Sequence, residues 1–131
     1  MSDNLIKNAQ KDAQVWMDAF NKKDFAAVVG LYVEDGFISN PWWTAAGSAA
    51  MENAFRVTDE KLHLTLTDIT VTDAKRFGDV EWRYGSWSGV TTAGKEMAAG
   101  GHWSALCRPQ GDRCRWLNHV INLELPPIPM Q

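Results

Sequence analysis

His119 lies where an ionisable side chain is unexpected. The segment WLNHVINLEL (residues 116–125) alternates in the manner of a β-strand, and His119 falls in register with the apolar Leu117, Ile121 and Leu123. Successive side chains of a strand point to opposite faces, so the pattern predicts an imidazole on the apolar face of a sheet. An imidazole titrates near neutral pH and can move protons. His119 is therefore a candidate for acid/base catalysis, or else a neutral core side chain bonded to a buried partner.

Large aromatic residues form the second candidate group, because the chain has 7 Trp among 131 residues. Such side chains provide contact area for apolar ligands. In DVEWRYGSWSGV, Trp82 and Tyr84 share a face, and the Tyr84 hydroxyl could donate a hydrogen bond to a substrate carbonyl. The charged Glu81 and Arg83 indicate that the opposite face is the outer one, which would leave Trp87 exposed. Ordinary packing of the sheet on helices is the alternative for Trp82 and Tyr84.

Polar residues supply further candidates. Asn40, which precedes Pro41 in FISNPWW, could orient a substrate oxygen or simply form a turn. Trp42 follows in the same loop, where we expect a pocket rim or a dimer contact. His102 and Ser104 could polarise a bound group, although alternation leaves the facing of their strand open.

The cysteines and histidines do not form a metal-site pattern. His102 and His119 lack the third ligand expected of a catalytic zinc site, and the spacings of cysteine zinc sites are absent. Cys107 and Cys114 flank the turn RPQGDR, where two reduced thiols are favoured over a cross-strand disulfide. We therefore expect no metal and no cofactor.

Size and charge limit the class of protein. A chain of 131 residues predicts one domain, residues 1–131, with a single core. The net charge of -3 and the scattered Lys and Arg argue against a nucleic-acid partner. No apolar stretch matches a signal peptide or a membrane span, so we expect a cytoplasmic protein that does not bind membranes.

The first half of the chain predicts three helices. Apolar residues three and four apart indicate an amphipathic first helix with Trp16 and Phe20 on its inner face. Asp24 is typical of the N-cap of a second helix, and Gly47 and Ser48 of the start of a third. The predicted helices are residues 2–24, residues 25–34, and a third that runs from Gly47 to about Phe55 or Val57.

The second half predicts four strands. From residue 62 the apolar pattern has a period of two, and Gly or Pro clusters separate the repeats. Helices followed by strands predict an α+β domain with one antiparallel sheet on a helical layer. The predicted strands are residues 62–72, 79–90, 98–108 and 113–125, and a proline-rich tail ends the last one.

Three segments carry a resemblance to a known family: AFNKKDFAAVVGLYVEDG (residues 19–36), the helix start at Gly47, and NHVINLELPP (residues 118–127). Together they resemble the nuclear-transport-factor-2-like superfamily, in particular its SnoaL-like and ketosteroid-isomerase-like branch. The resemblance covers nearly the whole chain. It implies a cone: a curved antiparallel sheet of about four long strands wrapped around three N-terminal helices, with an interior pocket. It also implies a homodimer, which we expect to form through the convex face of the sheet.

The resemblance also bears on the roles of individual candidate residues. Where ketosteroid-isomerase-like members place an aspartate base, this chain has Asn40, and Trp16 stands where they have an oxyanion-binding tyrosine. Their second oxyanion donor falls near Trp103 or Ser104. These departures argue against steroid isomerisation by that mechanism. SnoaL-like cyclases place an acid/base aspartate on the last strand, and that position corresponds to His119.

These observations predict a pocket for a small hydrophobic molecule, cyclic or aromatic and bearing an oxygen. In one hypothesis the pocket catalyses a cofactor-free isomerisation, cyclisation or dehydration, in which His119 moves a proton and Tyr84, Asn40 or Trp16 stabilises an oxyanion. The alternatives are ligand binding without chemistry, and a dimerisation domain whose own side chains fill the pocket. The predicted lining is Trp16, Phe20, Phe55, Val80, Trp82, Tyr84, Leu117, His119 and Ile121, with Trp42, His102 and Ser104 as further ligand contacts.

Overall fold

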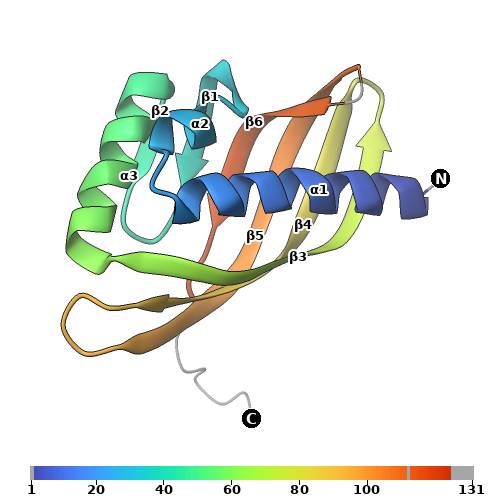
Figure 1. Cartoon of the computed structure of the whole chain (residues 1–131). Helices are drawn as coiled ribbons and strands as arrows, with labels where there is room; N and C mark the ends of the chain where they lie inside the picture. The colour runs from blue at the N-terminus through green and yellow to red at the C-terminus, as the bar shows by residue number, and fades with distance from the viewer. Residues whose placement is uncertain (1, 112, 125–131) are drawn as a thin grey trace, which may run out of the picture.

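The structure is a computed structural model, and it describes residues 2–111 and 113–124. Within this range three helices and six strands follow one another along the chain (Figure 1). The predicted order of helices first and a sheet second is confirmed. The elements are α1 (Ser2–Asn21), α2 (Phe25–Val29), β1 (Tyr32–Ser39), β2 (Thr44–Ala46), α3 (Ser48–Leu62), β3 (Leu64–Phe77), β4 (Val80–Thr91), β5 (Met97–Gln110) and β6 (Arg113–Ile121).

The strands form one curved sheet in the order β2-β1-β6-β5-β4-β3. All neighbours are antiparallel except β1 and β6, which are parallel. Figure 1 shows α1 lying across one face of the sheet and α3 beside the β1 and β2 end. The predicted α+β cone is confirmed, and two short strands join the four long ones that the alternation indicated.

The extra strands come from a segment predicted as helix. Asp24 caps α2 as expected, because its side chain accepts a hydrogen bond from the backbone of Ala27. The helix ends at Val29, however, and Tyr32 begins β1, so the prediction of a helix over 25–34 was wrong. Tyr and Val favour extended backbone, and parallel pairing with β6 satisfies the backbone groups that a longer helix would have used.

Two polar side chains of α1 fix the helix over the sheet. Gln10 donates to the carbonyl of Ile69 and accepts from the amide of Val71, each at 2.8 Å. Asn21 bonds the carbonyl and the amide of Leu66 at 2.9 and 2.8 Å. The pairing of β3 with β4 shifts register beside both sites, where bulges occur. These bonds hold the apolar side of α1 against the concave face of the sheet.

Strand β4 faces the other way from the prediction. Glu81 and Arg83 are buried, and the Nη1 of Arg83 donates to Oδ2 of Asp12 on α1 at 2.8 Å. Arg83 also bonds Glu81, so each charge has a partner inside the sheet. We call Asp12, Glu81 and Arg83 the charged cluster. By alternation Trp82 and Tyr84 then lie on the outer face, opposite the helices.

The structure settles the facing of β5, which alternation left open. Trp103, Ala105 and Cys107 point inward and are buried, whereas His102 is exposed and Ser104 lies on the outer face. Cys107 and Cys114, on either side of the turn between β5 and β6, are both buried free thiols. His63, the C-cap residue of α3, is exposed.

A bulge in β6 changes the alternation around His119. Leu106 pairs with Asn118 and Cys107 with Trp116, so Leu117 is an extra residue without a partner on β5. Trp116 and His119, three positions apart, therefore both point inward and are both 1% exposed. The inward facing of His119 is confirmed, but its predicted register with Leu117 was wrong. The proline-rich tail, residues 126–131, lies outside the described residues.

Candidate ligand-binding pocket

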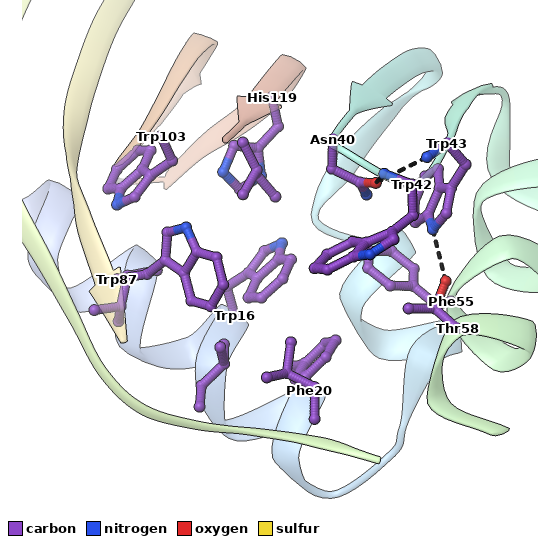
Figure 2. Close-up of a pocket in the computed structure, with 14 residues that line it drawn as sticks. Trp16, Phe20, Asn40, Trp42, Trp43, Phe55, Thr58, Trp87, Trp103 and His119 are labelled. Atoms are coloured by element: carbon purple, nitrogen blue, oxygen red, sulfur yellow. Dashed lines mark hydrogen bonds between the residues drawn. The ribbon is translucent and has the colours of Figure 1, made fainter. Parts of the chain in front are cut away.

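A cavity of about 60 Å³ lies between α1, α3 and the concave face of the sheet (Figure 2). Its wall is largely aromatic and aliphatic, and five of the chain's 7 Trp contribute to it. It is smaller than a pocket that encloses a whole drug-sized molecule, which measures about 300 Å³ or more. The lining residues are Trp16, Phe20, Asn40, Trp42, Trp43, Phe55, Thr58, Leu64, Leu66, Ile69, Trp87, Trp103, His119 and Ile121.

Three indole rings surround the His119 imidazole. The ring centroids of Trp16 and Trp103 lie 5.6 and 5.5 Å from that of His119, each in an edge arrangement, and that of Trp116 lies 4.7 Å away. Such a shell excludes water from the imidazole. It follows that any hydrogen bond to His119 comes from a fixed neighbour or from a molecule in the cavity.

His119 has one such neighbour, Tyr32 at the start of β1. The Nδ1 of His119 lies 2.8 Å from the Tyr32 hydroxyl oxygen, and the Trp16 indole N–H donates to that same oxygen at 2.9 Å. We call this chain of Trp16, Tyr32 and His119 the relay. The other ring nitrogen, Nε2, is buried and has no hydrogen-bond partner among the described residues.

Burial controls the charge states in the relay. Desolvation lowers the pKa of His119 from 6.5 to about 3, so the imidazole is neutral near pH 7. Burial also raises the pKa of Tyr32 above its usual value, which keeps the phenol protonated. No Asp or Glu is among the lining residues of the described chain. The pocket therefore offers hydrogen bonds and apolar contact rather than a group that exchanges protons at neutral pH.

The loop between β1 and β2 forms one side of the cavity. Oδ1 of Asn40 accepts hydrogen bonds from the amides of Trp42 and Trp43, both at 3.0 Å. The Trp43 indole in turn donates to Thr58 on α3 at 2.7 Å, as Figure 2 shows. Asn40 thus lies at the pocket as predicted, but its oxygen shapes the turn rather than facing a ligand. Trp42 is 43% exposed at the rim.

The structure brings together some of the sequence-predicted residues and separates others. His119, Asn40 and Trp42 line the cavity together with Trp16, Phe20, Phe55 and Ile121. The remaining candidates are absent from its wall: Val80, Trp82 and Tyr84 face outward on β4, His102 and Ser104 face outward on β5, and Leu117 occupies the bulge of β6.

Sequence reasoning missed Tyr32 and Trp87. Tyr32 was placed inside a helix, although it and the β-branched Val33 next to it favour a strand. Trp87 lines the cavity and donates from its indole to the carbonyl of Asn122 at 3.1 Å. Glu81 and Arg83 were the misleading signal, because opposite charges two residues apart on a strand can neutralise each other under a helix.

No family model and no curated protein matches the chain. Solved structures do match it over most of its length. A ketosteroid isomerase-like protein from Erwinia carotovora atroseptica has 18% identity and a TM-score of 0.79, over 94% of this chain and 96% of that one. The chain has the nuclear-transport-factor-2-like fold.

Two further structures agree. The match to an NTF2-like protein with a cystatin-like fold from Novosphingobium aromaticivorans has a TM-score of 0.70 and 17% identity, and it covers 92% of this chain and 82% of that one. The match to an NTF2-like protein of unknown function from Shewanella oneidensis has a TM-score of 0.67 and 14% identity, and it covers 88% and 97%. Identities this low establish the fold, and one fold hosts many functions. The fold alone therefore does not identify the function.

Within residues 2–111 and 113–124, no helix is long and apolar enough to cross a membrane. In the same part of the chain, no three side chains of His, Cys, Asp or Glu gather in a group that could hold a metal ion.

Proposed function

We propose that the pocket binds a small hydrophobic molecule, cyclic or aromatic, that carries an oxygen atom. The observation that supports this most is the Nε2 of His119, a buried polar atom that has no hydrogen-bond partner among the described residues, in a ring that lines a largely apolar cavity. A buried polar group without a hydrogen bond destabilises the fold by about 1–3 kcal/mol. A ligand oxygen at Nε2 would supply the missing bond.

The flat apolar surfaces of the pocket favour a ligand that contains a ring over one with an open chain. The indoles of Trp16, Trp87 and Trp103 all line the cavity near His119. Burying an aromatic ring removes about 150 Å² from water and contributes about 4 kcal/mol. Because the cavity holds about 60 Å³, a larger ligand would extend past the exposed Trp42 at the rim.

Of the roles expected from the sequence, ligand binding without chemistry is better supported than catalysis. A general base is most effective when its pKa lies near the working pH, and the pKa of His119 lies near 3. Of the three expected oxyanion donors, Tyr84 faces away from the cavity, the Trp16 indole donates to Tyr32, and the Asn40 oxygen accepts from the amides of its own loop. The chain therefore offers an imidazole hydrogen bond to a ligand, but among the described lining residues it offers no carboxylate that would accept a proton.

A pair of matched variants tests this proposal. Extracts of the native host, or a library of ring compounds, would be screened for ligands by native mass spectrometry, and the Kd of each ligand measured by calorimetry. We expect His119→Gln to weaken binding at least tenfold and His102→Gln, on the outer face, to leave it unchanged. Absence of any ligand, or equal effects of the two variants, would contradict the proposal.

We also propose that the protein forms a homodimer through the outer face of the sheet. The rings of Trp82 and Tyr84 lie 4.6 Å apart there, and Leu106 pairs with Trp82 across the strands, so apolar area is continuous on this face. Sedimentation equilibrium should show a dimer for the wild type and a monomer for Trp82→Glu. A monomeric wild type would contradict this proposal.

A further inference from the structure

The hydrogen bonds of the relay determine which way its protons point. An indole N–H can donate but cannot accept, so the contact of Trp16 with Tyr32 has one direction only. The Tyr32 oxygen is the acceptor in that bond. This leaves the single hydrogen of the Tyr32 hydroxyl to be assigned.

The only other side chain that is hydrogen-bonded to this hydroxyl in the described chain is His119. If Nδ1 of His119 carried a hydrogen, both nitrogen donors would point at the Tyr32 oxygen, and the hydroxyl hydrogen would have no acceptor. If Nδ1 carries none, the hydroxyl donates to it and both hydrogen bonds of the relay are made. The second arrangement leaves one buried group of the relay unbonded, the Nε2–H of His119, whereas the first leaves two, the Tyr32 hydroxyl hydrogen and the Nε2 lone pair, so the second is the stable one.

A neutral imidazole carries one hydrogen, on one of its two nitrogens. With Nδ1 accepting from Tyr32, that hydrogen is on Nε2, the unpartnered nitrogen of a ring that lines the cavity. We infer that Tyr32 and Trp16 hold His119 as a hydrogen-bond donor toward the pocket, so that the ligand is an apolar ring whose oxygen is an acceptor, as in a ketone or aldehyde. This inference rests on the proposed function, since it assumes that the pocket binds a ligand.

The rest of the wall excludes the other partners that Nε2 could have. The indoles of Trp87 and Trp103 already donate to backbone carbonyls, and the hydroxyl of Thr58 already donates to that of Ala54. A buried water normally makes two to four hydrogen bonds, and this wall presents one free buried side-chain group among the described residues. A molecule with one acceptor and an apolar body fits the cavity better than water does.

The tautomer can be measured directly. In a protein labelled with ¹⁵N, long-range proton–nitrogen correlations identify which imidazole nitrogen carries hydrogen, and His119→Gln assigns the signals of this ring among the 3 His. We expect the hydrogen of His119 on Nε2 at pH 7. A hydrogen on Nδ1 would overturn the inference and leave the proposed function standing.

Three small rings of similar size test the ligand class: cyclopentanone, which accepts, methylenecyclopentane, which has no polar atom, and pyrrole, which only donates. We expect the Kd of cyclopentanone to be about tenfold lower than those of the other two, because a site built to donate leaves its donor unpaired with the wrong ligand. Pyrrole binding as tightly as cyclopentanone would overturn the inference alone. Failure of all three to bind would contradict the proposed function as well.

The variant Tyr32→Phe tests whether the Tyr32 hydroxyl, rather than the packing of its ring, orients the hydrogen of His119. This variant removes one hydroxyl and keeps the ring, so Nδ1 loses its donor and Nε2 becomes free to accept. We expect the difference in Kd between cyclopentanone and the other two rings to become smaller. We also expect pyrrole to bind more tightly than methylenecyclopentane. Unchanged selectivity would overturn the role of Tyr32. The tautomer measurement on the wild type decides the inference if this variant does not fold.

Discussion

The charged cluster and the relay both bury polar side chains against the inner face of the sheet, but they differ in how completely they are bonded. In the charged cluster, Arg83 bonds Asp12 and Glu81, and Glu81 also bonds Arg76 at 3.0 Å. In the relay, one nitrogen of His119 has no partner in the described chain. A network in which every polar group is bonded needs no partner beyond the fold. A network with one unbonded buried group indicates that a partner is missing. The comparison therefore distinguishes the charged cluster, which stabilises the fold, from the relay, which has one hydrogen bond left for the proposed ligand.

Breaking the charged cluster should have the largest effect on stability. Arg83→Met removes the guanidinium and leaves Glu81 buried without its main partner. We expect the free energy of unfolding to fall by about 3–5 kcal/mol in urea denaturation. Arg56→Met is the matched control, because Arg56 forms an exposed pair with Glu52 that should contribute at most about 0.5 kcal/mol. Equal effects of the two variants would show that the charged cluster is not essential to the fold.

The second largest effect on stability should come from low pH, through the buried imidazole of the relay. The pKa of His119 is lowered to about 3 in the folded state, so between pH 6.5 and pH 3 the unfolded chain binds the extra proton. The stability from this residue is full above pH 6.5 and is lost as pH falls, by about 1.4 kcal/mol per pH unit. From pH 7 to pH 4 the wild type should lose about 3 kcal/mol more than His119→Gln. Parallel curves for the two proteins would contradict the burial of the imidazole.

A change in the loop between β1 and β2 should have a smaller effect on stability. Asn40→Ala removes the acceptor for the amides of Trp42 and Trp43. Because the site is only partly buried, we expect a loss of about 1–2 kcal/mol in thermal unfolding, together with weaker ligand binding. Asn53→Ala, at an exposed position of α3, should change neither property. A loss of stability without any loss of binding would show that the rim does not take part in the site.

The smallest expected change in stability comes from the centre of the pocket. His119→Leu loses the bond to Tyr32, which lowers stability, but it also removes the unpartnered Nε2, which raises it. The two effects offset each other, so we expect a net change within about 1 kcal/mol at pH 7 while ligand binding is lost. A destabilisation as large as that of Arg83→Met would place His119 with the structural groups.

Local patterns in the sequence predicted much of this fold. The period-two strands, the cap at Asp24 and the start of α3 at Gly47 each depend on near neighbours, and all three are confirmed. The inward position of His119 was also predicted, although the bulge at Leu117 was not. A bulge leaves little trace in alternation, because it moves one residue out of register and the pattern then resumes.

The errors concern interactions between distant segments. Arg83 is buried because Asp12, 71 residues earlier, lies above it on α1. The same reversal of face removed Tyr84 from the pocket and placed Trp87 in it. Tyr32 was missed because residues 25–34 suit a helix or a strand locally, and pairing with β6 decides between them. The relay, which joins three separate elements, could not be read from any one of them.

One measurement tests the central claim most directly: the proton chemical shift of the His119 Nε2–H during a titration with cyclopentanone. The account predicts that this hydrogen exists in the free protein, and that its resonance moves downfield and saturates as the ketone accepts the bond. Methylenecyclopentane should leave it in place. A bound ketone that does not move this resonance would show that His119 is not the polar contact of the pocket.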